Sequence, residues 1–398
     1  MTDSSNEPLG LYVHIPFCTA KCGYCDFNSY AGHEHMIPSY SRTLLTDAAL
    51  WKRAVRDRSI TSVFFGGGTP SLAPLEEMEH ILSGLQETFN IAPDAEISLE
   101  ANPGSLSVEY LCGLHDIGFN RISIGVQSFD DEELVVLDRI HTAADARAAY
   151  ADARAAGFDN INLDFIYGLP EQPLANWQRT LEEALALAPE HLSLYALTVE
   201  EGTPLARDVA RGRTPAPDPD AQAEQYEWTQ DRLARTAYRH YEISNWALPG
   251  RECRHNLLYW QHSEYLGLGA GAHSFLDGTR FSTVLLPNRY AELVDESAAE
   301  MTGERARMRH IATAETITPE LAAADALILG LRLIDGIDTT AFAARYGVDS
   351  YERHRSLFDE FVAYGIVERT DTHVRLTRRG RLLSNELFQR LLPEPATA

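Results

Sequence analysis

The stretch that decides the fold reads Tyr12-Val13-His14-Ile15-Pro16-Phe17-Cys18-Thr19-Ala20-Lys21-Cys22-Gly23-Tyr24-Cys25. Its apolar beginning predicts a β-strand, and the loop that follows holds three of the five cysteines of the chain. Thiolates gathered in one loop are a ligand set for a soft metal centre. Three cysteines leave one iron of a cubane iron–sulfur cluster without a protein ligand, and an open position lets a metal site bind a small molecule.

Two other uses of these cysteines are weighed against a cluster. A structural zinc site needs a fourth ligand, and His14, four residues before Cys18, is the candidate. A disulfide framework is not expected, because five cysteines in 398 residues, without a secretory signal, are typical of a reducing compartment. Cys112 lies in a helical pattern and is interpreted as a core thiol, whereas the role of Cys253 stays open.

The composition excludes several classes of protein. A formal net charge of −24 argues against a general nucleic-acid surface, which needs clustered Lys and Arg. The polar, acidic start of the chain does not resemble a signal peptide. No apolar run approaches the roughly 20 residues of a membrane helix. We therefore expect a cytoplasmic protein without a transmembrane segment and without a nucleic-acid partner.

Short apolar runs alternate with helical patterns from residue 11 to about residue 247. The predicted strands are residues 11–15, 62–65, 96–100, 121–126, 160–167 and 191–197, with a seventh at 239–243. Repeated strand–helix units predict an α/β fold, in which helices cover a parallel sheet. Each strand ends in a glycine-containing or polar loop, and in a β/α barrel such loops build the site.

Polar residues stand at these strand ends. The loop Gly66-Gly67-Gly68-Thr69-Pro70 lets a backbone approach a ligand, and its amides can bind a carboxylate, although glycine-rich turns are common. Glu100, Gln127 and Asp164 close or interrupt apolar runs, where a charge is costly unless it is paired or ligand-bound. The alternative to a ligand site is a salt bridge inside the barrel, with Arg121 or Arg139 as the cation.

The motif Cys18-x3-Cys22-x2-Cys25 resembles the cluster motif of radical S-adenosylmethionine (SAM) enzymes. In that superfamily the three cysteines hold a [4Fe-4S] cluster whose open iron binds the amino and carboxylate groups of SAM. The flanking residues look like the branch that contains oxygen-independent coproporphyrinogen III oxidase and related heme chaperones, and the resemblance covers essentially the whole chain. It implies an open, partial (β/α)6 barrel rather than a closed barrel of eight strands.

The resemblance also implies the cofactor contacts. The SAM-binding residues it indicates are Tyr12, Gly67, Gly68, Thr69, Glu100, Gln127, Arg139 and Asp164.

A second motif lies at His255-Asn256-x-x-Tyr259-Trp260. A histidine beside Tyr and Trp is usually packed and hydrogen-bonded, but this run resembles the HNxxYW motif of the heme-chaperone branch. The resemblance implies that the protein binds heme and that His255 coordinates the heme iron. Whether another histidine coordinates it instead stays open. The glycine-rich run from Gly267 to His273 looks like a turn that approaches the cofactors.

Two functions compete. The oxidase pattern carries a further cysteine two residues after the third cluster cysteine, and this chain has Phe27 there. The resemblance therefore favours a heme chaperone that delivers heme to acceptor proteins, among them respiratory and membrane-associated ones. The alternative is oxidative decarboxylation of coproporphyrinogen III. Whether SAM is cleaved, and hence whether the protein is an enzyme, stays open.

The expected domains follow from these patterns. They are a disordered start (1–9), the barrel (10–250), a connecting region with the HNxxYW run (251–300), a C-terminal domain (301–392) and a tail (393–398). Helices at 322–333 and 351–364, a hairpin at 366–376 and a last helix at 380–392 resemble a winged-helix module. Its basic cluster, Arg375 to Arg381, is small, so we expect a lid or interaction domain rather than a DNA-binding one.

Overall fold

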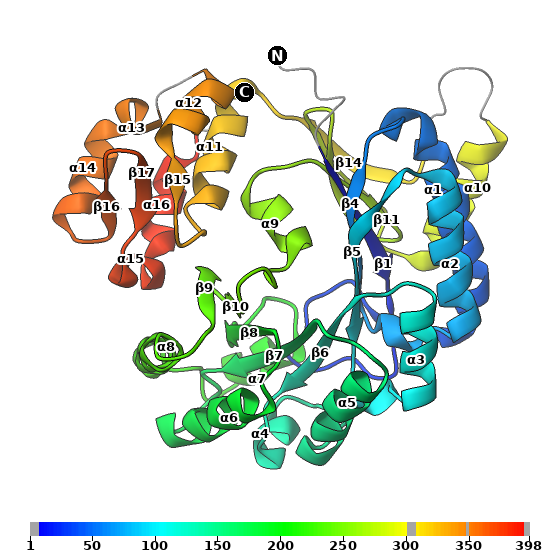
Figure 1. The fold of residues 1–398 in the computed structure, drawn as a ribbon, viewed down its shortest axis with the longest axis horizontal. Coiled ribbons are helices and arrows are strands. Elements are labelled where there is room, and N and C mark those ends of the chain that lie inside the picture. Colours follow the sequence, from blue (N-terminus) through cyan, green and yellow to red (C-terminus); the bar gives the residue numbers. More distant parts are fainter. Residues whose placement is uncertain (1–7, 301–307, 348–349, 394–398) are drawn as a thin grey trace.

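The computed structural model describes residues 8–300, 308–347 and 350–393, and within them twelve strands form one open sheet (Figure 1). Six neighbouring strands of this sheet run parallel. They are β1 (Leu9–Ile15), β4 (Ile60–Gly67), β5 (Ile91–Ala101), β6 (Arg121–Gln127), β7 (Ile161–Tyr167) and β8 (His191–Ala196). The prediction of a partial six-stranded barrel is confirmed.

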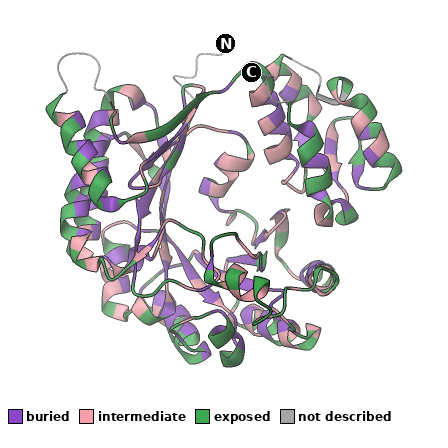
Figure 2. Cartoon of the chain, turned by 180° about the vertical axis from the view of Figure 1, so that it is seen from behind, coloured by how far each residue is buried: buried purple, intermediate pink, exposed green. Residues whose placement is uncertain are grey.

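Helices between these strands cover the outer face of the sheet (Figure 1). They are α1 (Ile37–Val55), α2 (Leu75–Thr88), α3 (Val108–Asp116), α4 (Asp131–Val136), α5 (Ala143–Ala155) and α6 (Leu174–Leu187), followed by α7 (Pro204–Ala210) and α8 (Pro219–Leu233). In α1, Tyr40, Leu44 and Ala48 recur every four residues and are buried against the sheet. Figure 2 shows the same division, with buried strands and helices that are exposed outward.

The sheet continues beyond the six parallel strands on both sides. Next to β1 lies β11 (Tyr265–Leu268), again parallel, followed by antiparallel β12 (His273–Leu276), β13 (Thr279–Thr283) and β14 (Ile311–Thr316). Next to β8 lie β10 (Asn245–Ala247) and β9 (Arg239–Glu242). The expected boundaries at residues 250 and 300 therefore fall inside one sheet, because the region interpreted as a connection pairs with β1. It also contributes α9 (Arg254–Trp260) and α10 (Pro287–Ala299).

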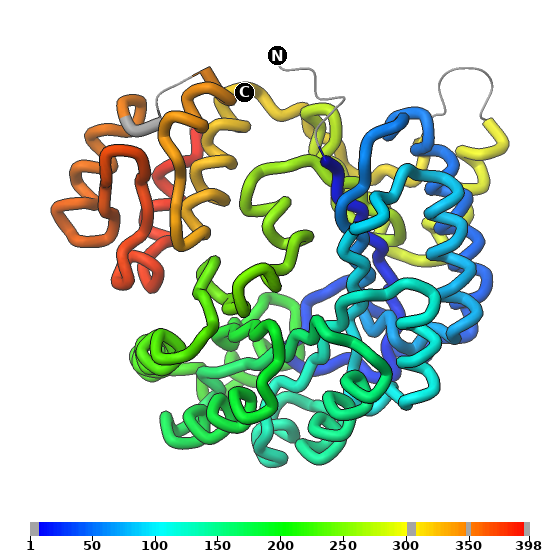
Figure 3. The backbone as a smooth tube through the Cα atoms, viewed as in Figure 1, coloured from blue at the N-terminus to red at the C-terminus, as the bar shows by residue number. Residues whose placement is uncertain are grey.

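The C-terminal domain has a hydrophobic core of its own. It contains α11 (Pro319–Gly330), α12 (Thr339–Tyr346), α13 (Ser350–Arg353), α14 (Arg355–Ala363), α15 (Arg378–Leu382) and α16 (Ser384–Leu391). The predicted hairpin is formed by β16 (Val367–Arg369) and β17 (His373–Leu376), to which β15 (Ile337–Asp338) adds a third strand. Figure 3 shows this domain on the far side of α9 from the sheet.

The expected terminal segments are described only in part. Residues 1–7 and 394–398 lie outside the described residues, whereas Leu9, expected in the disordered start, is fully buried at the beginning of β1. Of the helices that the structure describes, none is long and apolar enough to cross a bilayer.

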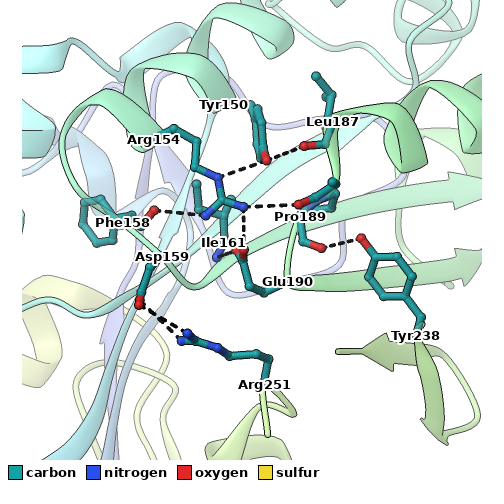
Figure 4. Close-up of polar contacts among 11 residues, drawn as sticks. Tyr150, Arg154, Phe158, Asp159, Ile161, Leu187, Pro189, Glu190, Tyr238 and Arg251 are labelled. Carbon is teal, nitrogen blue, oxygen red and sulfur yellow. Dashed lines mark hydrogen bonds and ion pairs between the residues drawn. The ribbon is translucent and has the colours of Figure 1, made fainter. Parts of the chain in front are cut away.

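A polar network ties the barrel together where β7 and β8 begin (Figure 4). Arg154 of α5 donates to the hydroxyl of Tyr150 (3.0 Å), the carbonyl of Phe158 (3.1 Å) and the carboxylate of Glu190 (2.7 Å). Glu190 in turn accepts the backbone N–H of Ile161 at 3.0 Å. The network joins a helix to the amino ends of two strands, the end of a β/α barrel that usually serves stability.

Candidate metal and cofactor site

The three cysteines of the opening stretch lie in one loop at the carboxyl end of β1. Cys18 belongs to the short strand β2 (Phe17–Cys18), which pairs with β3 (Tyr30–Ala31), and the N–H of Cys25 donates to the carbonyl of Cys22 at 3.2 Å. All three are free thiols, and all three line one cavity of about 470 Å³. A soft donor set around such a space fits a multi-iron cluster, in which each cysteine thiolate binds one iron.

The zinc alternative has no support in this geometry. Within the part of the chain that the structure describes, no three Cys, His, Asp or Glu side chains lie close enough to hold one metal ion. His14, the proposed fourth ligand, uses both ring nitrogens: Nε2 donates to the carbonyl of Asn28 (2.8 Å), and Nδ1 accepts the hydroxyl of Tyr12 (3.0 Å). The tautomer follows because a carbonyl only accepts.

The glycine-rich loop after β4 packs directly on the cysteine loop. The N–H groups of Gly68 and Thr69 donate to backbone carbonyls just before the first cysteine, at 2.9 and 2.8 Å, and the N–H of Gly67 donates to Glu100 at 3.2 Å. In this structure these three N–H groups therefore already have acceptors, and the acceptor of the Gly67 amide is a carboxylate. A side chain at Gly67 would clash with its surroundings, since a Cβ there would lie 2.5 Å from the ring of His14.

The barrel brings most of the predicted SAM residues into the cavity of the cysteines. Its lining includes Gly67, Gly68, Thr69, Glu100, Gln127, Arg139 and Asp164. Tyr12 is the exception and lines a second cavity, whose wall also includes Gly67 and Glu100. Since these two residues belong to both cavities, the cavities are direct neighbours.

Two carboxylates face the cysteine cavity, and the positive charge of the buried Arg121 acts on both of them. Glu100 is held by the Gly67 amide and Asp164 by the hydroxyl of Ser123 (2.7 Å), and neither forms an ion pair with a residue that the structure describes. Burial, together with the charge of Asp164, raises the pKa of Glu100 to about 7, and burial also raises the pKa of Asp164. The barrel-interior salt bridge considered from the sequence is therefore not what the structure shows. Carboxylates of this kind can accept hydrogen bonds from ligand hydroxyls.

Arg139 binds the rim of the site rather than these carboxylates. Its guanidinium donates to the side-chain oxygen of Asn102, to the carbonyl of Gly125 (2.9 Å) and to the sulfur of Cys22 (3.5 Å). The guanidinium therefore lies beside one of the three sulfurs that line the cavity. Gln127 nearby has a φ of +66°, an unfavourable backbone conformation for a residue other than glycine.

Sequence reasoning missed Asn102, which accepts from Arg139 and lines the cavity. Its position in the loop directly after a predicted strand was the available signal. It also missed Tyr195, which lies on the same wall and carried no signal in the sequence pattern.

His255 does not present a free nitrogen to a ligand. Its Nδ1 is 2.8 Å from the hydroxyl of Ser62, its Nε2 is 2.9 Å from the hydroxyl of Tyr259, and the side chain is 1% exposed. Its backbone N–H donates to Glu96, which caps the start of α9, and burial lowers the pKa of the ring to about 3. The structure thus does not support His255 as an iron ligand in this conformation.

The other end of the HNxxYW run does reach a cavity. Tyr259 and Trp260 of α9 line the second cavity, of about 770 Å³, which lies between the sheet and α11. His255 therefore anchors α9 to the sheet, and Tyr259 and Trp260 form part of the wall of the second cavity.

The open barrel and its cysteine loop define the class of the protein. Residues 12–184 match the Radical SAM superfamily, and residues 317–383 match the HemN C-terminal domain. Among solved structures, coproporphyrinogen III oxidase (HemN) from Escherichia coli has the same fold, with a TM-score of 0.84 and 23% identity, over 98% of this chain and 91% of that one.

Curated relatives narrow the class to one family. The heme chaperone HemW of Mycobacterium tuberculosis is 37% identical over 97% of this chain and 95% of its own length. HemW of Bacillus subtilis is 34% identical over 96% of this chain and 99% of its own length. The chain therefore belongs to the HemW family, and the oxidase alternative is not favoured.

Proposed function

We propose that this protein is a heme chaperone, which binds heme and transfers it to acceptor proteins. The observation that carries the proposal is the similarity to curated heme chaperones over nearly the full length of both chains. The sequence agrees with it, since the position of the extra oxidase cysteine is occupied by Phe27, whose exposed ring lies where the two cavities meet.

We further propose that Cys18, Cys22 and Cys25 hold a [4Fe-4S] cluster, which supplies a redox centre and an open iron for SAM. Support comes from three free thiols around one cavity and from a guanidinium beside one of them. The backbone of the glycine loop packs against the cysteine loop, since a Cβ on Gly68 would lie 3.0 Å from the sulfur of Cys18.

The remaining predicted residues form the proposed SAM site. Glu100 and Asp164 are suited to accept the ribose hydroxyls, because neither forms an ion pair within the described chain. Gln127 and Arg139 line the same cavity as the carboxylates and the thiols. Tyr12 supports the site indirectly, since it orients His14 behind Gly67.

Acceptors and compartment are part of the proposal. We expect heme-binding proteins, including respiratory proteins associated with membranes, as acceptors. Free thiols poised for a metal centre suit the reducing cytoplasm.

Transfer is the test of this function. Anaerobically purified protein is loaded with one equivalent of hemin, separated from free hemin, and mixed with an apo form of a b-type heme protein. Size-exclusion chromatography then follows the heme absorbance. The proposal predicts near-stoichiometric loading and movement of heme to the acceptor, whereas failure to retain hemin on the column would refute it.

A further inference from the structure

The second cavity is formed by one face of the sheet together with α9 and α11. In β12, His273 and Phe275 point into this cavity, while the alternate residues Ser274 and Leu276 are buried on the opposite face. Tyr265 of β11 pairs with Phe275 and lines the same cavity. Strand alternation thus gives the cavity a continuous wall of side chains.

The wall is suited to a large flat ligand. Four aromatic residues contribute to it, Tyr259, Trp260, Tyr265 and Phe275, and α11 adds aliphatic side chains from the other side. A volume of about 770 Å³ falls within the roughly 300–1,000 Å³ of ligand pockets. Aromatic and aliphatic surfaces on both sides of a slot bury an apolar ring system effectively.

Three histidines line this cavity, and their hydrogen bonds distinguish them. Both ring nitrogens of His14 are occupied. His262 is 7% exposed, stacks on Phe275 with ring centroids 4.7 Å apart, and shares Nδ1 with the hydroxyl of Tyr346. The imidazole of His273 is exposed and forms no hydrogen bond with any residue that the structure describes.

The same wall offers a cation for acidic groups on the ring. Arg280 of β13 lies directly opposite Phe275 and forms an ion pair with Asp325 of α11. A guanidinium has five N–H donors, so it can bind a second carboxylate beside Asp325. The two propionates of heme are groups of this kind.

We propose that heme lies in this second cavity, with His273, rather than His255, as the axial ligand of its iron. The inference rests on the proposed function and adds the place and the ligand. An imidazole with a free nitrogen is the usual protein ligand of heme iron, and the His273 side chain, which has no hydrogen-bond partner among the described residues, lies beside an aromatic slot. The site adjoins the cysteine cavity through Gly67 and Glu100, so heme and SAM would occupy neighbouring spaces.

The test compares hemin complexes of single variants by optical titration and by electron paramagnetic resonance of the ferric form. His273→Ala is expected to weaken hemin binding at least about tenfold and to remove the signature of histidine ligation. Added imidazole should restore that signature, because it can enter the space left by the side chain. His80→Ala, on the exposed outer face of α2, is the matched control and should behave as the unmodified protein.

The outcomes separate this inference from the function itself. A histidine-ligated complex that persists in His273→Ala but is lost in His255→Gln or His262→Gln would overturn the assignment and leave the chaperone function intact. Failure of the unmodified chain to bind hemin would refute the chaperone proposal and the assignment together. Melting temperatures of all variants show whether each one folds.

Discussion

The carboxylates at the two ends of the barrel differ in their partners. At the amino ends of the strands, Glu190 is satisfied by the guanidinium of Arg154 and by a backbone amide (Figure 4). At the carboxyl ends, Glu100 and Asp164 lie inside the barrel and form no ion pair with a residue that the structure describes, and burial raises the pKa of both. Burying a carboxylate without an ion pair costs free energy, and a bound ligand can recover part of it by hydrogen-bonding that carboxylate. We therefore call the amino ends of the strands the stability end of the barrel and the carboxyl ends the binding end.

The largest expected effect is at the binding end. Replacing Cys18, Cys22 and Cys25 together by alanine should abolish iron and sulfide incorporation during anaerobic reconstitution, from about four irons per chain to none. Cys112→Ala, outside the cavity, is the control and should keep the cluster. Stoichiometric zinc in place of iron and sulfide would contradict the cluster assignment.

Substitutions at the amino ends of the strands should lower the free energy of unfolding and leave cofactor binding unchanged. Arg154→Ala removes four hydrogen bonds and leaves Glu190, 15% exposed, without its cation, which should cost about 3 kcal/mol. Arg213→Ala breaks a pair that is largely exposed, and should cost less than about 1 kcal/mol. Denaturant titration measures both. A loss of SAM affinity in correctly folded Arg154→Ala would erase the distinction between the ends.

A single carboxylate tests the proposed cofactor contact. Glu100→Gln keeps an oxygen for the Gly67 amide but removes the charge, so SAM should bind the reconstituted protein about tenfold more weakly. Glu79→Gln, on the exposed surface of α2, provides the comparison. Anaerobic equilibrium dialysis gives the affinities, and equal affinity in both variants would exclude Glu100 from the SAM site.

The smallest effect is a pH dependence. In the cofactor-free protein the pKa of Glu100 is about 7, above its ordinary value of 4.5. Between these values the folded protein holds a proton that the unfolded chain has released, so this contribution to stability falls as pH rises from about 4.5 to 7. Glu100→Gln should flatten this fall in the free energy of unfolding, which denaturant titrations at the two ends of the range measure. An unchanged slope would show that the carboxylate is not destabilised by burial.

The sequence was sufficient for features encoded in short stretches. Apolar runs predicted the six parallel strands, and the motif resemblance implied residues such as Asp164 that line the cavity. Features that depend on residues far away in the chain could not be predicted from the sequence. The orientation of His255 is set by Ser62 and Glu96, more than 150 positions away, and β11 has only four residues. A motif can identify a family while its histidine serves packing rather than ligation.

The central claim is that the binding end handles heme as cargo rather than coproporphyrinogen III as substrate. The most direct measurement gives one anaerobically reconstituted preparation coproporphyrinogen III, SAM and a low-potential reductant, and quantifies protoporphyrinogen IX, while a parallel sample is titrated with hemin. The account predicts near-stoichiometric hemin binding and no catalytic decarboxylation. Many turnovers to protoporphyrinogen IX per chain would contradict it.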